Sequence, residues 1–389
     1  MGKLILYGNL VKKLKMFNKI KIYCVLFDTL PFIEEIVLFA KKNNLKILRQ
    51  VGGAFTVSSC IQMLTGKMLS DLSYHGIGYY LNRKYKDVST GSIEWPWKQD
   101  ILFDILLKND WNINTHNSRD VKKNIYDNPL VNKTVIFKKK YEKLMLEKNK
   151  IARILEKEEK KYINKIQIKK NNTNNFYFIE YQFYHQALFL RNKDKNKFKK
   201  IQKREIERSL RIMSEWNFDE PNSLFWFFSD HGFWELQKDN RHPHPQMYLS
   251  WVLFKDNTEN PIKVNSKVIS IRDFFITIMN KMKYNHKLIK DICPINFFQN
   301  QNRIYYVEDG RLSINKDIST TAIACKFKNW KKGIPKELLQ VSYHEPDDEW
   351  DCVLTCFDKN LFEKKSIQKK EIDKKMQQKV IERFNWIKK

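Results

Sequence analysis

Two apolar runs of the sequence stop abruptly at acidic residues. The first run, residues 20–27, is followed by Asp28, and the second, residues 223–228, leads within two residues to Asp230 and His231 and then a glycine. Adjacent aspartate and histidine side chains can both face a metal ion in a turn, and a glycine beside them lets the backbone approach closely. A single carboxylate at a strand end is also common as a helix cap or a surface turn. The Asp230–His231 pair is the more specific signal, and it predicts a metal site.

The segments around these residues alternate between strand and helix patterns. Short apolar runs are typical of parallel strands that are buried on both faces, and apolar residues at helical spacing follow them. Pro31 opens the first helical segment soon after Asp28. The strands that we expect are residues 20–27, 111–115, 176–181, 223–228 and 248–254. The first helix that we expect begins at Pro31, and the others cover residues 58–65, 99–108, 137–170, 203–216 and 270–283.

This alternation predicts an α/β fold, with a mostly parallel central sheet and helices on both faces. In open sheets of this kind, ligands bind outside the carboxyl ends of the strands. Asp28 and Asp230 directly follow such ends, so the fold class and the candidate metal site support each other.

The pattern changes beyond about residue 300. Two short strands, 338–343 and 350–357, precede a charged amphipathic helix that we expect over residues 362–389. We therefore expect an α/β domain over residues 1–300 and a small C-terminal α+β subdomain over residues 301–389.

The chain is strongly basic, with 72 lysines and arginines against 44 acidic residues in 389, a net charge of +28. Lysine greatly outnumbers arginine and is scattered along the chain, whereas specific phosphate and base recognition usually depends on arginine. We therefore interpret the charge as a solvated surface that can also attract anionic substrates, and we expect no specific nucleic-acid partner.

We find neither a secretory signal nor a membrane-spanning segment in the sequence. No run of eighteen apolar residues occurs, so we expect no transmembrane helix, and no apolar segment precedes a small-residue cleavage site. The six cysteines lack C-x-x-C spacing, which argues against a disulfide framework or a zinc ribbon. A cytoplasmic location is the simplest expectation.

Four motifs in order resemble the alkaline phosphatase–sulfatase superfamily. Residues 229–232, S-D-H-G, are similar to a signature of that family, and Asp28 in F-D-T-L-P resembles the D-T-L stretch that closes its first strand. Residues 56–67 end in L-T-G-K, like the family's nucleophile motif C-x-P-S-R-x-x-L-L-T-G-R, and residues 75–77 match its following H-G-I/V. The resemblance extends from about Lys19 to Lys283. It implies that residues 1–300 form a sulfatase-like catalytic domain.

The resemblance implies roles for particular residues. Counting back along the nucleophile motif puts Thr56 at the nucleophile position. Asp28, Asp230 and His231, together with the Thr56 hydroxyl, would bind one divalent metal ion, and these donors suit Mn, Mg, Ca or Zn. The aspartate and histidines that two-metal members add for a second ion lack a clear counterpart, so we expect a single-metal centre.

Four further residues are weaker candidates. His185 resembles a histidine that contacts the anion or leaving group in single-metal members, so we assign it a catalytic role. His242 and His244 lie where the family often places another site histidine, although a proline-flanked pair is also a typical surface turn. Lys67 is a candidate for binding the substrate anion, or simply a cation at a helix end.

The departures from the family pattern decide the expected reaction. Sulfatases convert a cysteine or serine into formylglycine within C/S-x-P-x-R, and threonine at position 56 cannot follow that route. Threonine is the nucleophile in the superfamily's phosphodiesterases and phosphoglycerol or phosphoethanolamine transferases. We therefore predict a metal-dependent hydrolase or transferase whose partner is an anionic phosphate ester. The alternatives are a sulfatase-like hydrolase of sulfuric or phosphonic esters, and a catalytically silent family member that binds anions. The sequence selects neither a substrate nor an oligomeric state.

Overall fold

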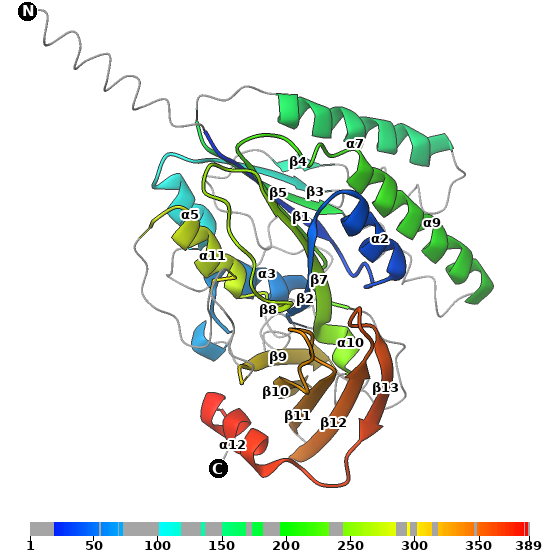
Figure 1. The fold of residues 1–389 in the computed structure, drawn as a ribbon, viewed down its shortest axis with the longest axis vertical. Helices are drawn as coiled ribbons and strands as arrows, with labels where there is room; N and C mark the ends of the chain where they lie inside the picture. Colours follow the sequence, from blue (N-terminus) through cyan, green and yellow to red (C-terminus); the bar gives the residue numbers. More distant parts are fainter. Residues whose placement is uncertain are drawn as a thin grey trace, which may run out of the picture.

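The computed structural model contains two β-sheets, a large one formed before residue 271 and a smaller one formed after residue 303 (Figure 1). It describes residues 19–53, 56–68, 70–72, 101–117, 134–136, 150–168, 173–181, 195–232, 244–284, 294–295, 302–312, 318–345, 348–384 and 386–387. None of the helices within these ranges is both long enough and apolar enough to cross a membrane.

The large sheet has the strand order β4-β3-β5-β1-β6-β7-β2-β8. Its strands are β1 (Lys21–Phe27), β2 (Lys46–Val51), β3 (Asn112–Asn117), β4 (Thr134–Ile136), β5 (Asn175–Tyr181), β6 (Ser223–Phe228), β7 (Leu249–Asp256) and β8 (Val268–Ser270). Of these described strands, β7 alone runs against the others, because it pairs antiparallel with β6 and β2 while the other neighbours pair in parallel. The prediction of a mostly parallel central sheet is therefore confirmed.

Helices cover both faces of this sheet, as the alternation of strands and helices predicted. On β1, Tyr23 and Val25 belong to one apolar core, and Ile22 and Cys24 belong to another. The first core lies under α2 (Glu34–Lys42), α7 (Lys150–Ile168) and α9 (Lys195–Ser214). The second lies under α3 (Thr56–Thr65), α5 (Leu102–Leu107) and α11 (Asp273–Lys281). Because successive strand side chains point to opposite faces, the apolar run of β1 supplies both cores.

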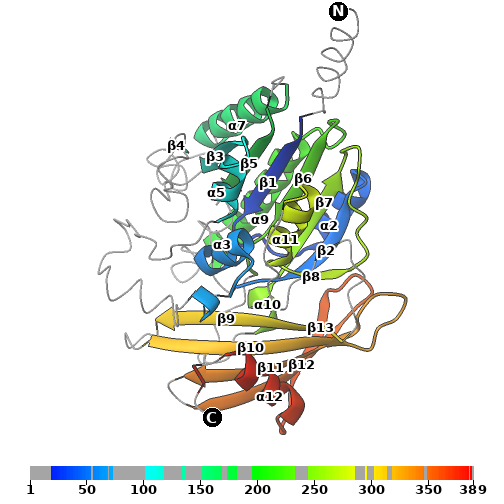
Figure 2. The same cartoon turned by 90° about the vertical axis from the view of Figure 1, so that its left-hand side faces the viewer.

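The smaller sheet is antiparallel throughout, with the order β13-β12-β11-β10-β9. Its strands are β9 (Ile304–Leu312), β10 (Ile318–Lys328), β11 (Glu337–Glu345), β12 (Glu349–Phe357) and β13 (Glu363–Gln368), and α12 (Lys374–Arg383) packs on it. Two short elements complete the description: the 3-10 helix η1 (Ser70–Leu72) and α10 (Pro245–Tyr248). The small sheet lies at the end of the large sheet toward which β1 runs (Figures 1 and 2).

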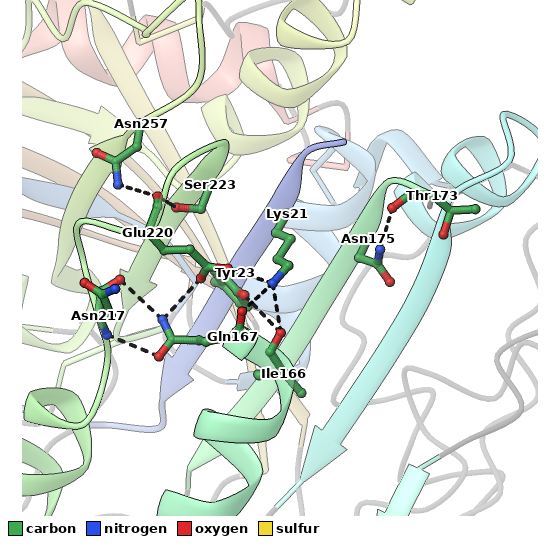
Figure 3. Close-up of polar contacts among 10 residues, drawn as sticks. All are labelled: Lys21, Tyr23, Ile166, Gln167, Thr173, Asn175, Asn217, Glu220, Ser223 and Asn257. Carbon is green, nitrogen blue, oxygen red and sulfur yellow. Dashed lines mark hydrogen bonds and ion pairs between the residues drawn. The ribbon is translucent and has the colours of Figure 1, made fainter. Parts of the chain in front are cut away.

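The opposite, amino edge of the large sheet is held by a polar network (Figure 3). Lys21 at the start of β1 donates hydrogen bonds to the carbonyls of Ile166 and Gln167 in the last turn of α7, at 3.1 and 2.7 Å. The same ammonium group lies 2.7 Å from a carboxylate oxygen of Glu220. Gln167 and Glu220 are also hydrogen-bonded to each other. The network therefore joins β1, the end of α7 and the turn before β6.

The C-terminal helix that we expected over residues 362–389 is wrong in its first part. Residues 363–368 form β13, an edge strand that pairs with β12, and a helix follows only from Lys374 to Arg383. The sequence E-K-K-S-I-Q has no apolar face of its own, so its strand conformation comes from pairing with a partner. Strands β9 and β10 were not predicted from the sequence either. A domain boundary at residue 300 stays a prediction.

Candidate metal centre

Asp28, Asp230 and His231 meet at the carboxyl edge of the large sheet. Asp28 follows β1, and the other two follow β6, which lies beside β1. One ligand atom from each of the three side chains lies within 4.8 Å of the others. All three residues are buried, with exposed fractions of 1%, 0% and 8%. The fold thus brings Asp28 next to the Asp230–His231 pair, which lies about two hundred positions later in the chain.

A tight turn after β1 brings the two loops into contact. Thr29 has a φ of 55°, a left-handed conformation that is uncommon outside glycine. In this conformation its backbone N–H donates to Asp230 Oδ1 at 3.1 Å, while the N–H of Asp28 donates to the Tyr181 carbonyl on β5 at 2.9 Å. Both aspartates are therefore fixed by backbone hydrogen bonds between neighbouring strand ends.

The orientation of His231 suits metal ligation. Its Nδ1 lies 2.8 Å from the carbonyl oxygen of Gly232, so Nδ1 carries the proton and donates it. The lone pair is then on Nε2, which lies 3.4 Å from Asp230 Oδ2. A hydrogen bond from the second ring nitrogen to a carbonyl is the usual way in which proteins orient a histidine ligand.

The set of donors fits a small divalent cation. Two buried carboxylates that approach each other this closely repel unless positive charge lies between them. Carboxylate oxygens and an imidazole nitrogen are donors for Mn, Zn and Mg, and the remaining coordination positions can be filled by substrate or water. Asp28, Asp230 and His231 are the residues that would hold such an ion.

Two glycines let other segments approach the centre. A Cβ atom on Gly232 would lie 1.7 Å from the carbonyl oxygen of Gln246, and one on Gly52 would lie 2.8 Å from the carbonyl oxygen of Asp230. Side chains at these positions would displace the backbone on either side of the ligands. The close packing around the Asp230–His231 turn therefore requires glycine at both sites.

Helix α3 begins at Thr56 and is fastened to the same turn. Ser59, one helical turn after Thr56, donates from its hydroxyl to the carbonyl of Asp230 at 3.0 Å and lies 3.2 Å from that of Gly53. The side chain of Thr56 lies outside the described residues. Its backbone stands in the first turn of a helix, where free N–H groups favour an anion.

Of the other four predicted site residues, two lie within the described part of the chain and two lie outside it. His185 and His242 lie outside the described residues, so their roles stay predictions. His244 is the N-cap of α10: its Nδ1 accepts a hydrogen bond from the Gln246 N–H, and its Nε2 lies 3.4 Å from Glu363. Lys67 lies two residues beyond Thr65, the last residue of α3, and therefore at the opposite end of that helix from Thr56. Its role in binding the substrate anion stays a prediction, like the alternative of a cation at a helix end.

Three residues that support the site were missed by the sequence analysis. Gln50 on β2 donates to the Ser229 carbonyl at 3.2 Å, Ser59 holds α3, and Glu363 contacts α10. Gln50 is fully buried, but β2 also contains a lysine and an arginine, so a glutamine in this strand did not stand out in the sequence. Nothing in the sequence indicated Ser59 or Glu363, because their partners lie far away along the chain.

The fold resembles solved structures, although no family model and no curated protein matches the sequence. A protein in the alkaline phosphatase superfamily from Vibrio parahaemolyticus matches with a TM-score of 0.55 and 9% identity, over 93% of this chain and 84% of that chain. The lipoteichoic acid synthase LtaP from Listeria monocytogenes matches with a TM-score of 0.50 and 15% identity, over 95% of this chain and 92% of that chain. At such identities the likeness concerns the fold. The chain has the fold of the alkaline phosphatase superfamily, as its motifs predicted.

Proposed function

We propose that the chain is a metal-dependent hydrolase or transferase that acts on a phosphate ester through Thr56. The observation that carries the proposal is the convergence of Asp28, Asp230 and His231 next to the helix that begins at Thr56. A divalent cation bound by these residues would neutralise charge on the ester and lower the pKa of a nearby hydroxyl.

The roles of the chain's own residues follow from this arrangement. The N–H groups in the first turn of α3 donate hydrogen bonds to the phosphoryl oxygens, and the Thr56 hydroxyl attacks phosphorus. A bond between Thr56 Oγ1 and phosphorus forms while the ester bond breaks and the alcohol leaves. Water or a second alcohol then releases the phosphoryl group from threonine. In this proposal His185 and His242 contact the anion or the leaving group.

Hydrolysis and transfer differ only in the acceptor. Since the resemblance of the motifs includes phosphoglycerol transferases, glycerol and other alcohols belong among the acceptors to be tried. A sulfatase reaction is the weaker alternative, because threonine cannot provide the formylglycine that sulfate-ester cleavage uses.

The first experiment measures metal content and turnover together. We expect about one ion per purified chain, and hydrolysis of an aryl phosphate monoester or diester with added Mn, Zn, Mg or Ca, with little turnover of the aryl sulfate. Thr56→Ala should lower turnover at least about a thousandfold, because the nucleophile is lost. Thr173→Ala, at the opposite edge of the sheet, is the matched control and should keep full activity.

The outcomes separate the alternatives. Full activity in Thr56→Ala would refute the assignment of the nucleophile. No bound metal and no turnover across the whole panel would favour a silent member that binds anions, and binding that weakens steeply with salt would then support it.

A further inference from the structure

Three consecutive residues at the start of β13 contact the loop after β1 and helix α10, the two segments beside the candidate metal centre. Leu361 and Phe362 directly precede β13, and Glu363 is its first residue. We refer to residues 361–363 as the bridge segment. On one side it contacts the loop after β1, which begins with Asp28. On the other side it contacts α10, which packs against the Asp230–Gly232 turn.

The first contact combines an aromatic stack with a buried cation. The ring of Phe362 stacks on that of Phe32, with centroids 4.6 Å apart and planes at 25°. Phe32 lies four residues after Asp28, and the guanidinium of Arg49 lies 4.2 Å from its ring centroid. Arg49 is buried and donates to the Leu361 carbonyl at 2.9 Å. The loop that follows Asp28 is therefore packed against the bridge segment.

The second contact is made by the carboxylate of Glu363. Its Oε2 accepts a hydrogen bond from Gln246 Nε2 at 2.8 Å, and its Oε1 lies 3.4 Å from His244 Nε2. Since Nδ1 of His244 accepts from the Gln246 N–H, its proton is on Nε2 and points to Glu363. The hydroxyl of Ser366 also donates to Glu363, at 2.8 Å. The carboxylate thus contacts the N-cap and the second residue of α10.

Helix α10 in turn contacts Gly232, the residue directly after His231. The N–H of Gly232 donates to the Met247 carbonyl at 2.9 Å, and there is no space for a side chain between Gly232 and Gln246. The Gly232 carbonyl in turn accepts the Nδ1 proton of His231. A displacement of α10 therefore changes the orientation of the His231 ring.

We infer that the bridge segment positions the two halves of the metal centre, and that Glu363 is a positioning residue for His231. The inference rests on the proposed function only in that the centre binds a divalent cation. Glu363 contacts none of the three candidate ligands in the hydrogen bonds described, so it acts through Gln246 and Gly232. Loss of a residue that orients a metal ligand typically weakens metal affinity 10–100-fold.

The test is the affinity for Mn²⁺ alone, measured by titration calorimetry on the metal-free full chain. We expect Glu363→Ala to weaken binding about 10–100-fold. Glu363→Gln keeps an acceptor for Gln246 but loses the charge that faces His244, so its affinity should lie between those of Glu363→Ala and the wild type. Glu337→Gln is the control, because Glu337 is half-buried in the same sheet and accepts from an amide, Asn329 Nδ2, at 2.6 Å. Its affinity should equal that of the wild type.

A second measurement separates positioning from simple loss of structure. Well below the melting temperature, a saturating concentration of Mn²⁺ should restore most of the turnover of Glu363→Ala, which a generally damaged fold would not allow. Wild-type affinity in Glu363→Ala would overturn the inference and leave the proposed function intact. A wild-type chain that binds no Mn²⁺ would overturn the proposed function instead, and the inference with it.

Discussion

At the scale of single residues, the candidate centre depends on close backbone contacts as much as on its ligands. Gly232 is the clearest case, because the position that a Cβ would occupy is already filled by the Gln246 carbonyl. We expect Gly232→Ala to displace His231 and to weaken Mn²⁺ affinity at least about tenfold, as measured by calorimetry.

Gly333 provides the control for this substitution. Its φ is +72°, and a Cβ there would have no atom within 4 Å. Gly333→Ala should therefore cost about 1 kcal/mol of stability through the left-handed conformation alone, and it should leave metal affinity unchanged. Equal affinities in both variants would contradict the close-contact explanation.

The sequence was enough to pick out the three candidate ligands, but not most of the residues that support them. Asp28, Asp230 and His231 were predicted because each follows a recognisable buried strand, and parallel strands end at the same edge of a sheet. The role of Glu363 depends on how two sheets dock, and that is set by contacts between distant residues. Thr56 was placed by motif alone, and the structure adds that a helix begins there.

At the scale of elements, the amino edge of the large sheet depends on one buried cation. Lys21 joins the last carbonyls of α7 to Glu220, which is largely buried. Lys21→Met would leave that carboxylate without its cation, so we expect a loss of about 3 kcal/mol in the free energy of unfolding, measured with urea at pH 7.

The neighbouring pair of Lys255 and Asp219 tests the effect of burial. These groups are 2.6 Å apart, but the Asp219 side chain is 87% exposed. Lys255→Met should therefore cost less than about 1 kcal/mol. Similar losses in Lys21→Met and Lys255→Met would show that the network of Figure 3 contributes no more than a surface ion pair.

Elements with their own apolar pattern were predicted well, and elements that depend on a partner were not. The helix expected over residues 203–216 overlaps the second half of α9, which ends at Ser214, and the strand expected over residues 223–228 is β6. In contrast, β13 has a charged sequence without a strand pattern, and it forms because β12 offers a free edge. Pairing of this kind cannot be read from the composition of a segment.

At the scale of the whole molecule, a buried carboxylate on the small sheet contacts both η1 and the segment after α12. Glu308 on β9 accepts hydrogen bonds from the N–H of Ser70 at 2.9 Å and from the indole N–H of Trp386 at 3.2 Å. Beside it, Asp71 accepts two hydrogen bonds from Arg383, at 2.8 and 2.7 Å. Burial raises the pKa of Glu308 from 4.5 to about 7, and its hydrogen bonds offset this only in part.

The raised pKa of Glu308 makes stability depend on pH. Between about pH 4.5 and 7 the folded chain keeps a proton on Glu308 that the unfolded chain has lost, so this contribution to stability falls as the pH rises through that interval. The slope is at most about 1.4 kcal/mol per pH unit. In urea denaturation at pH 5, 6, 7 and 8, Glu308→Gln should remove this decline, and Glu337→Gln should keep it. Parallel curves for wild type and Glu308→Gln would refute the prediction.

The bridge segment has a consequence for the order of events during synthesis. All three candidate ligands lie before Gly232, so the ribosome synthesises them well before it reaches Leu361, Phe362 and Glu363. A nascent chain therefore carries its ligands on loops that still lack their support from the small sheet. If Glu363 positions His231 as proposed, these loops bind a cation most weakly at that stage. On the proposed role of Glu363, the protein acquires its ion as a finished molecule, when translation of the second sheet is over.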